Sequence, residues 1–470
     1  MGTGSPRFDY DTVIIGAGMS GLAAGIRLAY YDQRVCILER HTTIGGLNSF
    51  YRLNDRNYDV GLHALTNFTV KGTKKGPLAR LLRQLRIGWD EWSLLPQAGS
   101  RIAFPEVSLR FNNDFELLRA EIERHFPDQT AKFEKLLTEI ADYDDLDFTR
   151  ADCSAREVVS GIISDPLLVE MLFCPLMYYG SAREHDMDFA QFCIMFRSIF
   201  FEGLGRPAAG VRLILKTLVR RFRALGGDLR LRAGVNRLVV EDGAVERLLL
   251  DDGTEITARH ILSSAGWCET MRLCGAETTA ESDPAGQLSF CEAMAVLDCQ
   301  PRELGHEETV IFFNDSPTFH WQKACDLLDY RSGVICSPNN FVYDEPPVEG
   351  MVRVTMLANY NLWRSLPEAD YRLAKLAGYD RMLASAVRFT PDFRGRVIAT
   401  DMFTPTTIKR FTGHDNGAVY GAAKKHYDGA THLKNLFICG TDQGFVGIIG
   451  AITSGISMAN RHVLQAAEPR

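Results

Sequence analysis

Three glycines near the N-terminus have the spacing of a phosphate-binding turn. Gly16, Gly18 and Gly21 follow a short apolar run and open a stretch with helical apolar spacing. In such a turn the first glycine allows a tight bend, the second lets the backbone approach a pyrophosphate, and the third lets the helix pack on the sheet. The helix N-terminus adds free N–H groups and a partial positive charge. We therefore predict that this turn, with Met19 and Ser20 inside it, binds the pyrophosphate of a dinucleotide.

An acidic residue closes the next apolar run. Glu39 ends the sequence RVCILE, and Arg40 follows it. A carboxylate at this place can accept hydrogen bonds from both ribose hydroxyls and repels a 2′-phosphate. An ordinary glycine-rich turn with a solvated glutamate does not explain the shared spacing, so the pattern favours a dinucleotide site.

A pair of adjacent glycines, Gly45 and Gly46, comes a few residues after Glu39 and is followed by Leu47. By itself the pair is as compatible with a plain loop as with a cofactor contact. Residues 49–61 alternate apolar and polar positions around a polar turn, which predicts a β-hairpin.

A second glycine-rich segment lies near the C-terminus. The apolar run 435–439 leads into Gly440 and Asp442, and a glycine-rich stretch then opens the last predicted helix. Asp442 is placed to hydrogen-bond the ribityl or phosphate groups of a flavin dinucleotide. The helix N-terminus at 447–451 would face the pyrimidine edge of the flavin, where its dipole stabilises the charge of the reduced ring.

The elements that position these segments follow from the apolar spacing. Strand, helix and strand fit into about 30 residues at the N-terminus, which is one βαβ unit. Asp-Gly turns separate three later runs and predict a β-meander. The predicted strands are 11–16, 34–39, 234–241, 244–250, 255–263 and 435–439; the predicted helices are 19–31, 208–225 and 450–464, and 115–200 is mostly helical.

Length and composition place the chain among soluble globular proteins. It has 470 residues, 46% hydrophobic and 24% charged, which is long enough for two domains. The net charge of −7 gives no basic field for nucleic acid, and no apolar run is long enough to span a bilayer. The eleven cysteines form no C-x-x-C pair, so we expect buried thiols in a reducing cytosol and no metal site.

The segment 404–421 adds a resemblance to a known family. It runs TPTTIKRFTG from Thr404 and ends GAVYG at Gly421. Together with the glycine-rich segments, it resembles the FAD-dependent amine oxidase and phytoene desaturase superfamily. The segment is similar to the one just before the C-terminal flavin motif of carotenoid desaturases, carotenoid isomerases and retinol saturases.

The resemblance implies FAD as the cofactor and a set of contacts to it. Gly45 and Gly46 would turn beside the pyrophosphate and ribityl chain, Gly61 would lie close to the flavin, and Val235 would contact the adenine. The expected cofactor contacts are Gly16, Gly18, Met19, Ser20, Gly21, Glu39, Arg40, Gly45, Gly46, Leu47, Gly61, Leu62, His63, Val235, Ala265, Gly440, Asp442, Gly447, Ile448, Ile449 and Ala451.

The resemblance also implies the fold, which is α/β. A Rossmann-type FAD-binding domain of the amine oxidase-like (GR2) kind would be combined with a discontinuous α+β substrate-binding domain. We expect the FAD-binding domain to comprise 1–85, 205–285 and 400–470, and the substrate-binding domain to comprise 86–204 and 286–399.

The family's chemistry moves hydrogen along an apolar polyene, isoprenoid or lipid, with hydride exchanged at flavin N5. A long apolar tunnel is therefore expected, although plain core packing is the commoner role of such residues. The candidates to line it are Phe173, Met177, Tyr178, Tyr179, Phe192, Met195, Phe196, Phe200 and Phe201.

Two residues are candidates for catalysis. His63 follows the Gly61 turn and would relay protons at the flavin, or serve as a structural histidine. Arg410 would pair with the flavin or a carboxylate, or act structurally beside the cofactor. Tyr420 is expected in or near the site.

A basic stretch, 70–92, carries six cations before its first acid, interleaved with leucine and tryptophan. It suits peripheral contact with an anionic membrane, and equally a solvated helix with a core-facing leucine stripe.

Two other functions stay open: a true amine oxidase on the same fold, and a prenyl-lipid-binding protein of the GDP-dissociation-inhibitor type without catalysis. Intact Gly16, Gly18, Gly21, Glu39 and Asp442 argue against the second of these.

Overall fold

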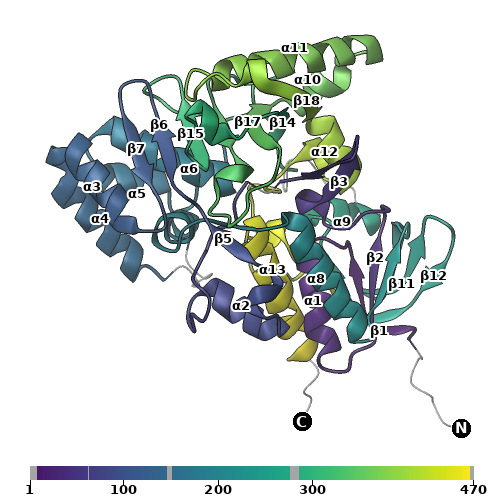
Figure 1. Ribbon diagram of the computed structural model, residues 1–470. Helices are drawn as coiled ribbons and strands as arrows, with labels where there is room; N and C mark the ends of the chain where they lie inside the picture. The colour runs from purple at the N-terminus through teal and green to yellow at the C-terminus, as the bar shows by residue number, and fades with distance from the viewer. Residues whose placement is uncertain (1–7, 62, 145–150, 276–284, 466–470) are drawn as a thin grey trace, which may run out of the picture.

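The computed structural model describes residues 8–61, 63–144, 151–275 and 285–465. Its two main sheets, one parallel and one mixed, lie in separate halves of the molecule, each covered by helices (Figure 1). This mixed α/β architecture confirms the predicted fold class.

The parallel sheet has five strands in the order β19-β13-β1-β2-β9. They are β1 (Tyr10–Ile15), β2 (Val35–Glu39), β9 (Asp228–Leu231), β13 (Ala258–Ser263) and β19 (Leu436–Ile438). β2 is buried along its whole length, as a strand covered on both faces must be. The apolar runs that predicted strands at 11–16, 34–39 and 435–439 therefore belong to one sheet.

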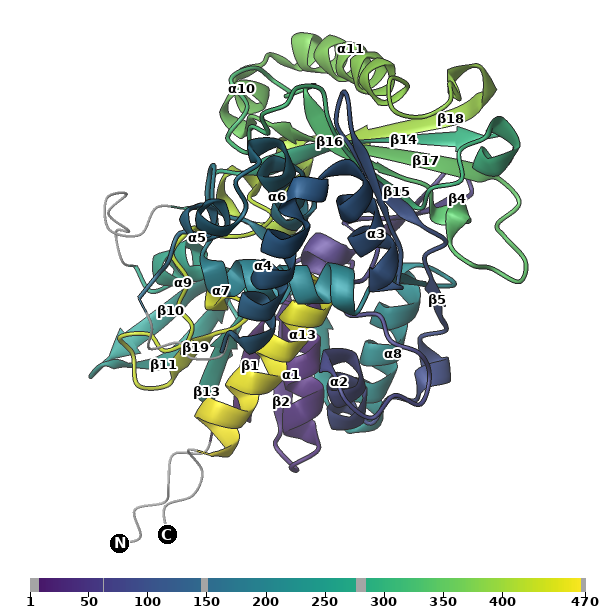
Figure 2. The ribbon, with the colours of Figure 1, turned by 90° about the vertical axis from the view of Figure 1, so that its left-hand side faces the viewer.

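Both faces of the parallel sheet are covered. One face carries α1 (Met19–Ala29), α8 (Val211–Ala224) and α13 (Gly447–Met458), and Figure 2 shows α1, α13 and α2 side by side. Leu22, Leu215 and Ile452 pack in the core between these helices and the sheet. The other face carries the antiparallel strands β10 (Val235–Glu241), β11 (Ala244–Leu250) and β12 (Glu255–Ile256).

The predicted third strand of the meander, 255–263, is wrong as a single strand. Its first part, β12, pairs with β11, whereas its second part, β13, leaves the meander and pairs in parallel with β1. Ile261 and Leu262 are adjacent and both fully buried. Adjacent side chains of a strand point to opposite faces, so this pair needs a sheet that is covered on both sides.

The mixed sheet has seven strands in the order β18-β14-β17-β16-β15-β6-β7, and only β15 and β6 pair in parallel. They are β6 (Ser100–Ala103), β7 (Ser108–Phe111), β14 (Ser289–Leu297), β15 (Val310–Asn314), β16 (Ser332–Cys336), β17 (Gly350–Ala358) and β18 (Val397–Phe403). Two helices, α10 (Tyr360–Ser365) and α11 (Glu368–Ala386), pack on one face through Trp363, Met382 and Leu383.

Five helices pack on the other face of the mixed sheet. They are α3 (Phe115–His125), α4 (Thr130–Asp142), α5 (Ala155–Ile162), α6 (Pro166–Gly180) and α7 (Phe189–Phe196). Asp114, Ser154, Asp165 and Asp188 cap four of these helices with side-chain oxygens that accept first-turn N–H groups. Local sequence thus fixes where the predicted helical region 115–200 divides.

Short elements join the two halves. The predicted hairpin is present as β3 (Phe50–Leu53) and β4 (Arg56–Asp59), and β5 (Leu94–Pro96) pairs with β8 (Gly205–Pro207). Two further helices are α9 (Trp267–Leu273) and α12 (Pro405–Thr412). The parallel sheet takes its strands from three separate stretches of chain. The exact domain boundaries stay a prediction.

The leucine stripe of the basic stretch 70–92 packs in the core. The stretch contains α2 (Pro77–Leu85), whose Leu78, Leu81 and Leu82 are at most 2% exposed and pack in the core with α1 and α13. Trp92 is fully buried in the same core. The leucine stripe therefore faces inward and leaves the cations on the solvated face, as the solvated-helix alternative expects. Contact of these cations with an anionic membrane stays a prediction.

Because Leu82 is a core residue, we expect Leu82→Ala to lower the free energy of unfolding by about 2–5 kcal/mol. Arg83→Ala is the matched control, because Arg83 is exposed on the same helix, and a change within about 0.5 kcal/mol is expected. Urea unfolding measures both. Equal stabilities for the two variants would place Leu82 outside the core.

Within the described part of the chain, the model has no helix of the length and apolarity that crossing a membrane requires. All eleven cysteines are described, and all are free thiols.

Candidate active site

A cavity of about 400 Å³ lies where four strands of the parallel sheet end. Gly16, Glu39, Ser264 and Gly440 each follow or end one of these strands, and all four line it. Open α/β sheets bind ligands at this carboxyl edge. The chain therefore brings the two glycine-rich segments, more than 400 residues apart in sequence, to one site.

The first glycine turn has the geometry that its sequence predicts. Gly16 adopts φ +97°, and Gly18 occupies the N-cap of α1 without a side chain to cap it. A Cβ on Gly21 would lie 2.1 Å from the Gly16 carbonyl oxygen. Gly21 therefore faces the sheet as a packing residue. The N-cap of α1 has no side-chain cap among the described residues, so this helix end is suited to an anion.

Glu39 lines the cavity with a carboxylate that the backbone holds in place. Oε2 accepts from the Ala17 N–H at 2.9 Å, and Oε1 accepts from the His41 N–H at 2.9 Å. Each oxygen keeps a second lone pair, so the carboxylate can still accept a pair of hydroxyls.

The adjacent glycines Gly45 and Gly46 lie against the first glycine turn. Gly45 adopts φ +110° and donates its N–H to the Ala17 carbonyl at 2.9 Å, which places it beside Gly18. A Cβ on Gly46 would have Gly18 Cα, at 3.8 Å, as its nearest described neighbour. The space next to Gly46 is therefore open toward the cavity, whereas a Cβ on Gly45 would lie 2.6 Å from the Asn48 carbonyl oxygen. The contact of this glycine pair with a cofactor stays a prediction.

The C-terminal helix presents its N-terminus to the cavity. Gly447, Ile448 and Ala451 line it, and the N-cap Val446 has no side-chain acceptor for the first N–H groups of α13. Ile449 instead packs in the core beneath the parallel sheet, so its predicted cofactor contact is corrected.

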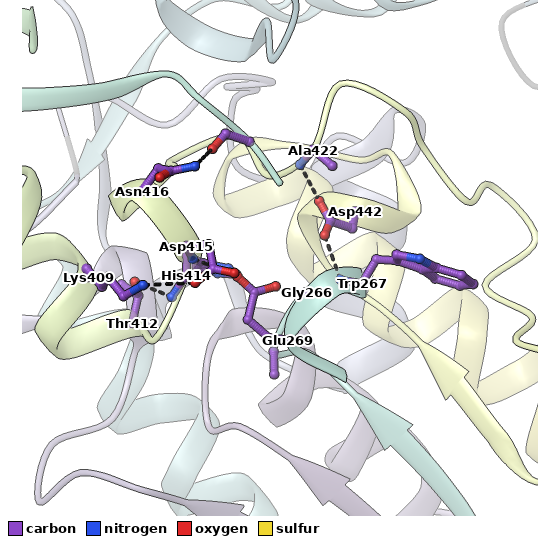
Figure 3. Close-up of polar contacts among 12 residues, drawn as sticks. Gly266, Trp267, Glu269, Lys409, Thr412, His414, Asp415, Asn416, Ala422 and Asp442 are labelled. Carbon is purple, nitrogen blue, oxygen red and sulfur yellow. Dashed lines mark hydrogen bonds and ion pairs between the residues drawn. The ribbon is translucent and has the colours of Figure 1, made fainter. Parts of the chain in front are cut away.

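Backbone donors of other segments hold the Asp442 carboxylate, whereas a cofactor contact through the backbone at Asp442 stays a prediction. Its carboxylate is 4% exposed and accepts the backbone N–H groups of Trp267 at 2.7 Å and Ala422 at 2.8 Å (Figure 3). Among the described residues, Thr441 lines the cavity at this point and Asp442 does not. The carboxylate therefore joins α9 and the loop after Tyr420 to β19, and its oxygens are not aimed at a cofactor.

Most other predicted contacts do line the first cavity. They are Gly16, Gly18, Met19, Ser20, Glu39, Arg40, Gly45, Gly46, Leu47, Gly61, His63, Val235, Ala265, Gly440, Gly447, Ile448 and Ala451. Leu62 lies outside the described residues, so its predicted contact has no structural account.

The cavity also has residues that sequence reasoning did not select. Ser264 directly follows β13, at the same edge of the sheet as Gly16 and Glu39. Glu269 and His414 come from separate segments, with Glu269 Oε1 3.8 Å from His414 Nδ1 and 2.7 Å from the Asp415 N–H (Figure 3). Burial alone lowers the pKa of His414, but Glu269 and the nearby carboxylates raise it above its usual value.

A second cavity, of about 430 Å³, adjoins the first. The two share Gly61, His63, Tyr178 and Tyr420 among their lining residues. The second is lined mainly by apolar side chains from the β3–β4 hairpin, β14, β18 and α12. These include Phe50, Leu53, Val60, Phe290, Val334, Met402, Phe403, Ile408, Phe411 and Val419.

His63 stands at the junction of the two cavities. Its Nε2 lies 2.9 Å from Thr355 Oγ1 and 3.5 Å from Glu292 Oε1. Burial lowers the pKa of His63 below its usual value, although Glu292 opposes this. The imidazole is therefore neutral at neutral pH, with one N–H and one lone pair.

Arg410 lies on the surface. Its side chain is exposed and approaches the Phe411 ring at 5.6 Å, and it lies outside the described lining of both cavities. The cavity contacts of α12 come from Ile408, Phe411 and Thr412 instead. The expectation of a catalytic Arg410 is therefore corrected.

The aromatic residues of α6 and α7 divide between site and core. Tyr178 and Tyr179 line the described cavities, and the Tyr420 hydroxyl donates to the Tyr178 carbonyl. Phe173, Phe192 and Phe196 are fully buried in the core beside the mixed sheet. The same core contains Met177, Met195, Phe200 and Phe201. Most of the expected tunnel lining is therefore packing, and the hairpin and the mixed sheet supply the apolar wall.

A family model for flavin containing amine oxidoreductases matches residues 19–270. The chain belongs to this family. The match begins at the first residue of α1 and ends within α9. It therefore includes Gly45, Gly46, Glu39 and helices α3 to α7.

Curated relatives of this flavoenzyme align over nearly its whole length. A prolycopene isomerase of Arabidopsis thaliana is 21% identical over 96% of this chain and 82% of the relative. An all-trans-retinol 13,14-reductase of Danio rerio is 22% identical, covering 97% and 87%. A 4,4′-diaponeurosporene oxygenase of Staphylococcus aureus is 22% identical, covering 97% and 99%. These relatives confirm the predicted resemblance to the carotenoid branch of the superfamily.

Solved structures share the fold. An oxidoreductase from Methanosarcina mazei superposes with a TM-score of 0.66 at 17% identity, covering 95% of this chain and 99% of the other. A double mutant of putrescine oxidase gives 0.64 at 15% identity, covering 97% and 99%. The chain is thus a flavin-dependent oxidoreductase of the amine oxidase superfamily.

Proposed function

We propose that this flavoenzyme uses FAD and acts on a long apolar polyene or polyprenoid lipid, which it desaturates, saturates or isomerises. One observation supports this above the others. A glycine-cradled cavity and a mainly apolar cavity meet at His63, Tyr178 and Tyr420. That junction is where a cofactor and an apolar substrate would meet.

The residues present fit FAD. Side chains at Gly18 and Gly46 would project into space that has few described neighbours, so glycine keeps this space open for a pyrophosphate. The N-termini of α1 and α13 supply N–H groups at two ends of the cavity, and Glu39 supplies a ribose acceptor. We propose that the residues lining the first cavity, with Val235 near the adenine, hold the cofactor. When bound, the flavin exchanges hydride at N5.

The second cavity supports an apolar substrate. Phe50, Phe290 and Met402 are among the side chains that face it, and burial of such surface favours a hydrocarbon by about 25 cal/mol per Å². The relatives named as prolycopene isomerase and retinol reductase act on polyenes. We extend that substrate class, without a specific compound, to this chain.

The experiment is anaerobic mixing of the oxidised and the reduced protein with C30 and C40 polyenes, retinoids and amines. Bleaching of the oxidised flavin by a polyene indicates desaturation, and reoxidation of the reduced flavin indicates saturation. A changed double-bond geometry without a net redox change indicates isomerisation. Bleaching by amines alone would favour the amine oxidase alternative. A protein that binds polyenes but never takes up FAD would favour the prenyl-lipid-binding alternative.

We propose His63 as the residue that exchanges a proton with the substrate. With a substrate identified, His63→Ala is expected to retain FAD and to lower the turnover rate by about 10²-fold or more, because proton transfer to a positioned side chain contributes that much. His432→Ala, at an exposed position, is the matched control and should keep the wild-type rate. An unchanged rate in His63→Ala with FAD bound would remove His63 from the reaction.

A further inference from the structure

A buried ion pair lies in the wall of the second cavity beside His63. The side chains of Glu292 and Arg353 are 2% and 1% exposed, and Arg353 Nε donates to Glu292 Oε1. The same Glu292 oxygen is 3.5 Å from His63 Nε2, which also lies 2.9 Å from Thr355 Oγ1. One edge of the imidazole is therefore held by side chains of two central strands.

The register of the mixed sheet puts these side chains together. Glu292 of β14 pairs directly with Thr355 of β17. Arg353 is two residues before Thr355, so it lies on the same face and one diagonal step from Glu292. Arg353 also donates to the Asp59 carbonyl at 3.2 Å, which ties the pair to the β3–β4 hairpin. The geometry is thus fixed by the sheet and needs no ligand to form.

Stability does not account for this arrangement. Taking two charges out of water costs several kcal/mol per ion, and apolar residues of similar size often stabilise a core better. The neighbouring wall of the cavity is apolar. A charged pair at this place is therefore better explained by its contact with His63.

Two ion pairs, Glu292–Arg353 and Asp59–Arg206, lie around His63. Glu292 and Arg353 face its ring from the mixed sheet, and Arg206 of β8 donates to the His63 carbonyl at 3.3 Å. Arg206 is itself paired with Asp59. The Cys336 thiol of β16 lies 3.6 Å from the His63 carbonyl, and burial raises the pKa of that thiol to about 11, so it stays neutral. Glu292 is thus the anion nearest to the ring, and Arg353 and Arg206 are the nearest cations.

The Glu292 carboxyl is ionised at neutral pH. Burial raises the pKa of its carboxyl, but Arg353 and His63 outweigh burial and lower it to about 2. An ionised carboxylate accepts hydrogen bonds and donates none. With the Thr355 hydroxyl accepting as well, a hydrogen on His63 Nε2 would face two acceptors, and Nδ1 would keep the lone pair.

We propose that Glu292, locked by Arg353, is a positioning residue that orients His63 and fixes its tautomer for proton exchange with the substrate. This rests on the proposed function. In desaturation, a bound flavin would supply the hydride acceptor for one carbon, and His63 Nδ1 would take the proton from the neighbouring carbon. The electron pair of that second C–H bond becomes the new double bond, and solvent later takes the proton. Saturation is the reverse.

The first test uses opposite charge changes in holoenzyme labelled with ¹⁵N at histidine. Glu292→Gln removes the anion and leaves Arg353, so the pKa of His63 should fall by about one unit of pH or more. Arg353→Met removes the cation beside Glu292 and leaves its negative charge next to the His63 ring, so the pKa of His63 should rise by a similar amount. NMR titration, with His63 assigned by its loss in His63→Ala, measures this without any substrate. Shifts of the same sign, or none, would overturn the proposal.

Either single variant leaves one buried charge unpaired and can fail to fold. The double variant Glu292→Leu with Arg353→Met removes both charges. It should retain FAD and the fold, and kcat should fall 10- to 100-fold with little change in KM, as when the outer partner of a functional histidine is lost. Arg353→Lys keeps the charge and should keep the wild-type pH profile. A double variant with wild-type kcat and pH profile would contradict the proposal.

A control variant distinguishes the loss of the Glu292–Arg353 pair from the loss of an ion pair elsewhere in the protein. Glu170→Gln removes one partner of the Arg156–Glu170 pair, which joins α5 to α6 outside the described lining of both cavities. It should leave the pH profile and the His63 titration unchanged. If no polyene reacts but the opposite His63 shifts are seen, the proposed substrate fails while the positioning of His63 stands.

Discussion

Gly18→Val is expected to give a folded protein that has lost its flavin. Gly18 has φ −75°, which any residue adopts, and a Cβ there would have the Gly45 carbonyl oxygen, at 4.0 Å, as its nearest described neighbour. The protein alone therefore tolerates a side chain. A valine would occupy the space through which the backbone approaches the pyrophosphate. Flavin absorbance per protein should fall to background while the far-ultraviolet circular dichroism stays unchanged.

Gly21→Val provides the contrast within the same turn. Its Cβ would lie 2.1 Å from the Gly16 carbonyl oxygen, and backbone cannot move aside as a flexible side chain can. Overpacking of this kind costs about 1–3 kcal/mol and sometimes more, so thermal stability should fall along with flavin content. A Gly18→Val protein that purifies with a full complement of flavin would show that the cofactor lies elsewhere.

Asp442→Ala is expected to lower the free energy of unfolding by about 2–6 kcal/mol, because two backbone donors lose their acceptor at about 1–3 kcal/mol each. These donors are the N–H groups of Trp267 and Ala422. The loop also presses closely on the carboxylate, since a Cβ on Gly421 would lie 1.9 Å from Oδ1. Denaturant unfolding measures the loss, and amide hydrogen exchange should accelerate at both donors.

Asp442→Asn is the matched control for that loss. The amide oxygen can accept one of the two N–H groups, while its NH₂ faces the other, so about half of the destabilisation is expected. If Asp442→Ala were as stable as the wild type but had lost FAD, the carboxylate would be a cofactor ligand after all.

The N-terminal half of the cofactor site could be predicted because its signals are local. Gly16, Gly18 and Gly21 lie between a buried strand and a helix, so spacing alone fixes the turn. Glu39 ends the adjacent strand, and its carboxylate reaches the same edge of the sheet. Gly440 comes after the last strand in the same way and also lines the cavity.

The direction of the Asp442 side chain could not be predicted from the local sequence. An acid after a strand and a glycine suits a cofactor ligand equally well in sequence. Its direction depends on Trp267 and Ala422, whose N–H groups come from other segments. Glu292 and Arg353 were missed for a related reason, because their contact with His63 depends on the register of β14 and β17.

Apolar spacing alone could not show whether the leucines of α2, or the aromatic residues of α6 and α7, pack in the core. The leucines of α2 have a periodicity that suits either a membrane or a core, and the neighbouring α1 and α13 decide for the core. The aromatic residues of α6 and α7 suit either a tunnel or a core, and their mutual contacts decide for the core in most cases. Phe192 and Phe196, for example, have ring centroids 6.0 Å apart.

The most direct test of the central claim is the identity and amount of the cofactor in the purified wild-type protein. Visible absorbance should show an oxidised flavin, and chromatography of the heat-released cofactor should identify FAD at about one per chain. A colourless protein that takes up no FAD on reconstitution would contradict the account, because the glycine-cradled cavity would then serve another ligand.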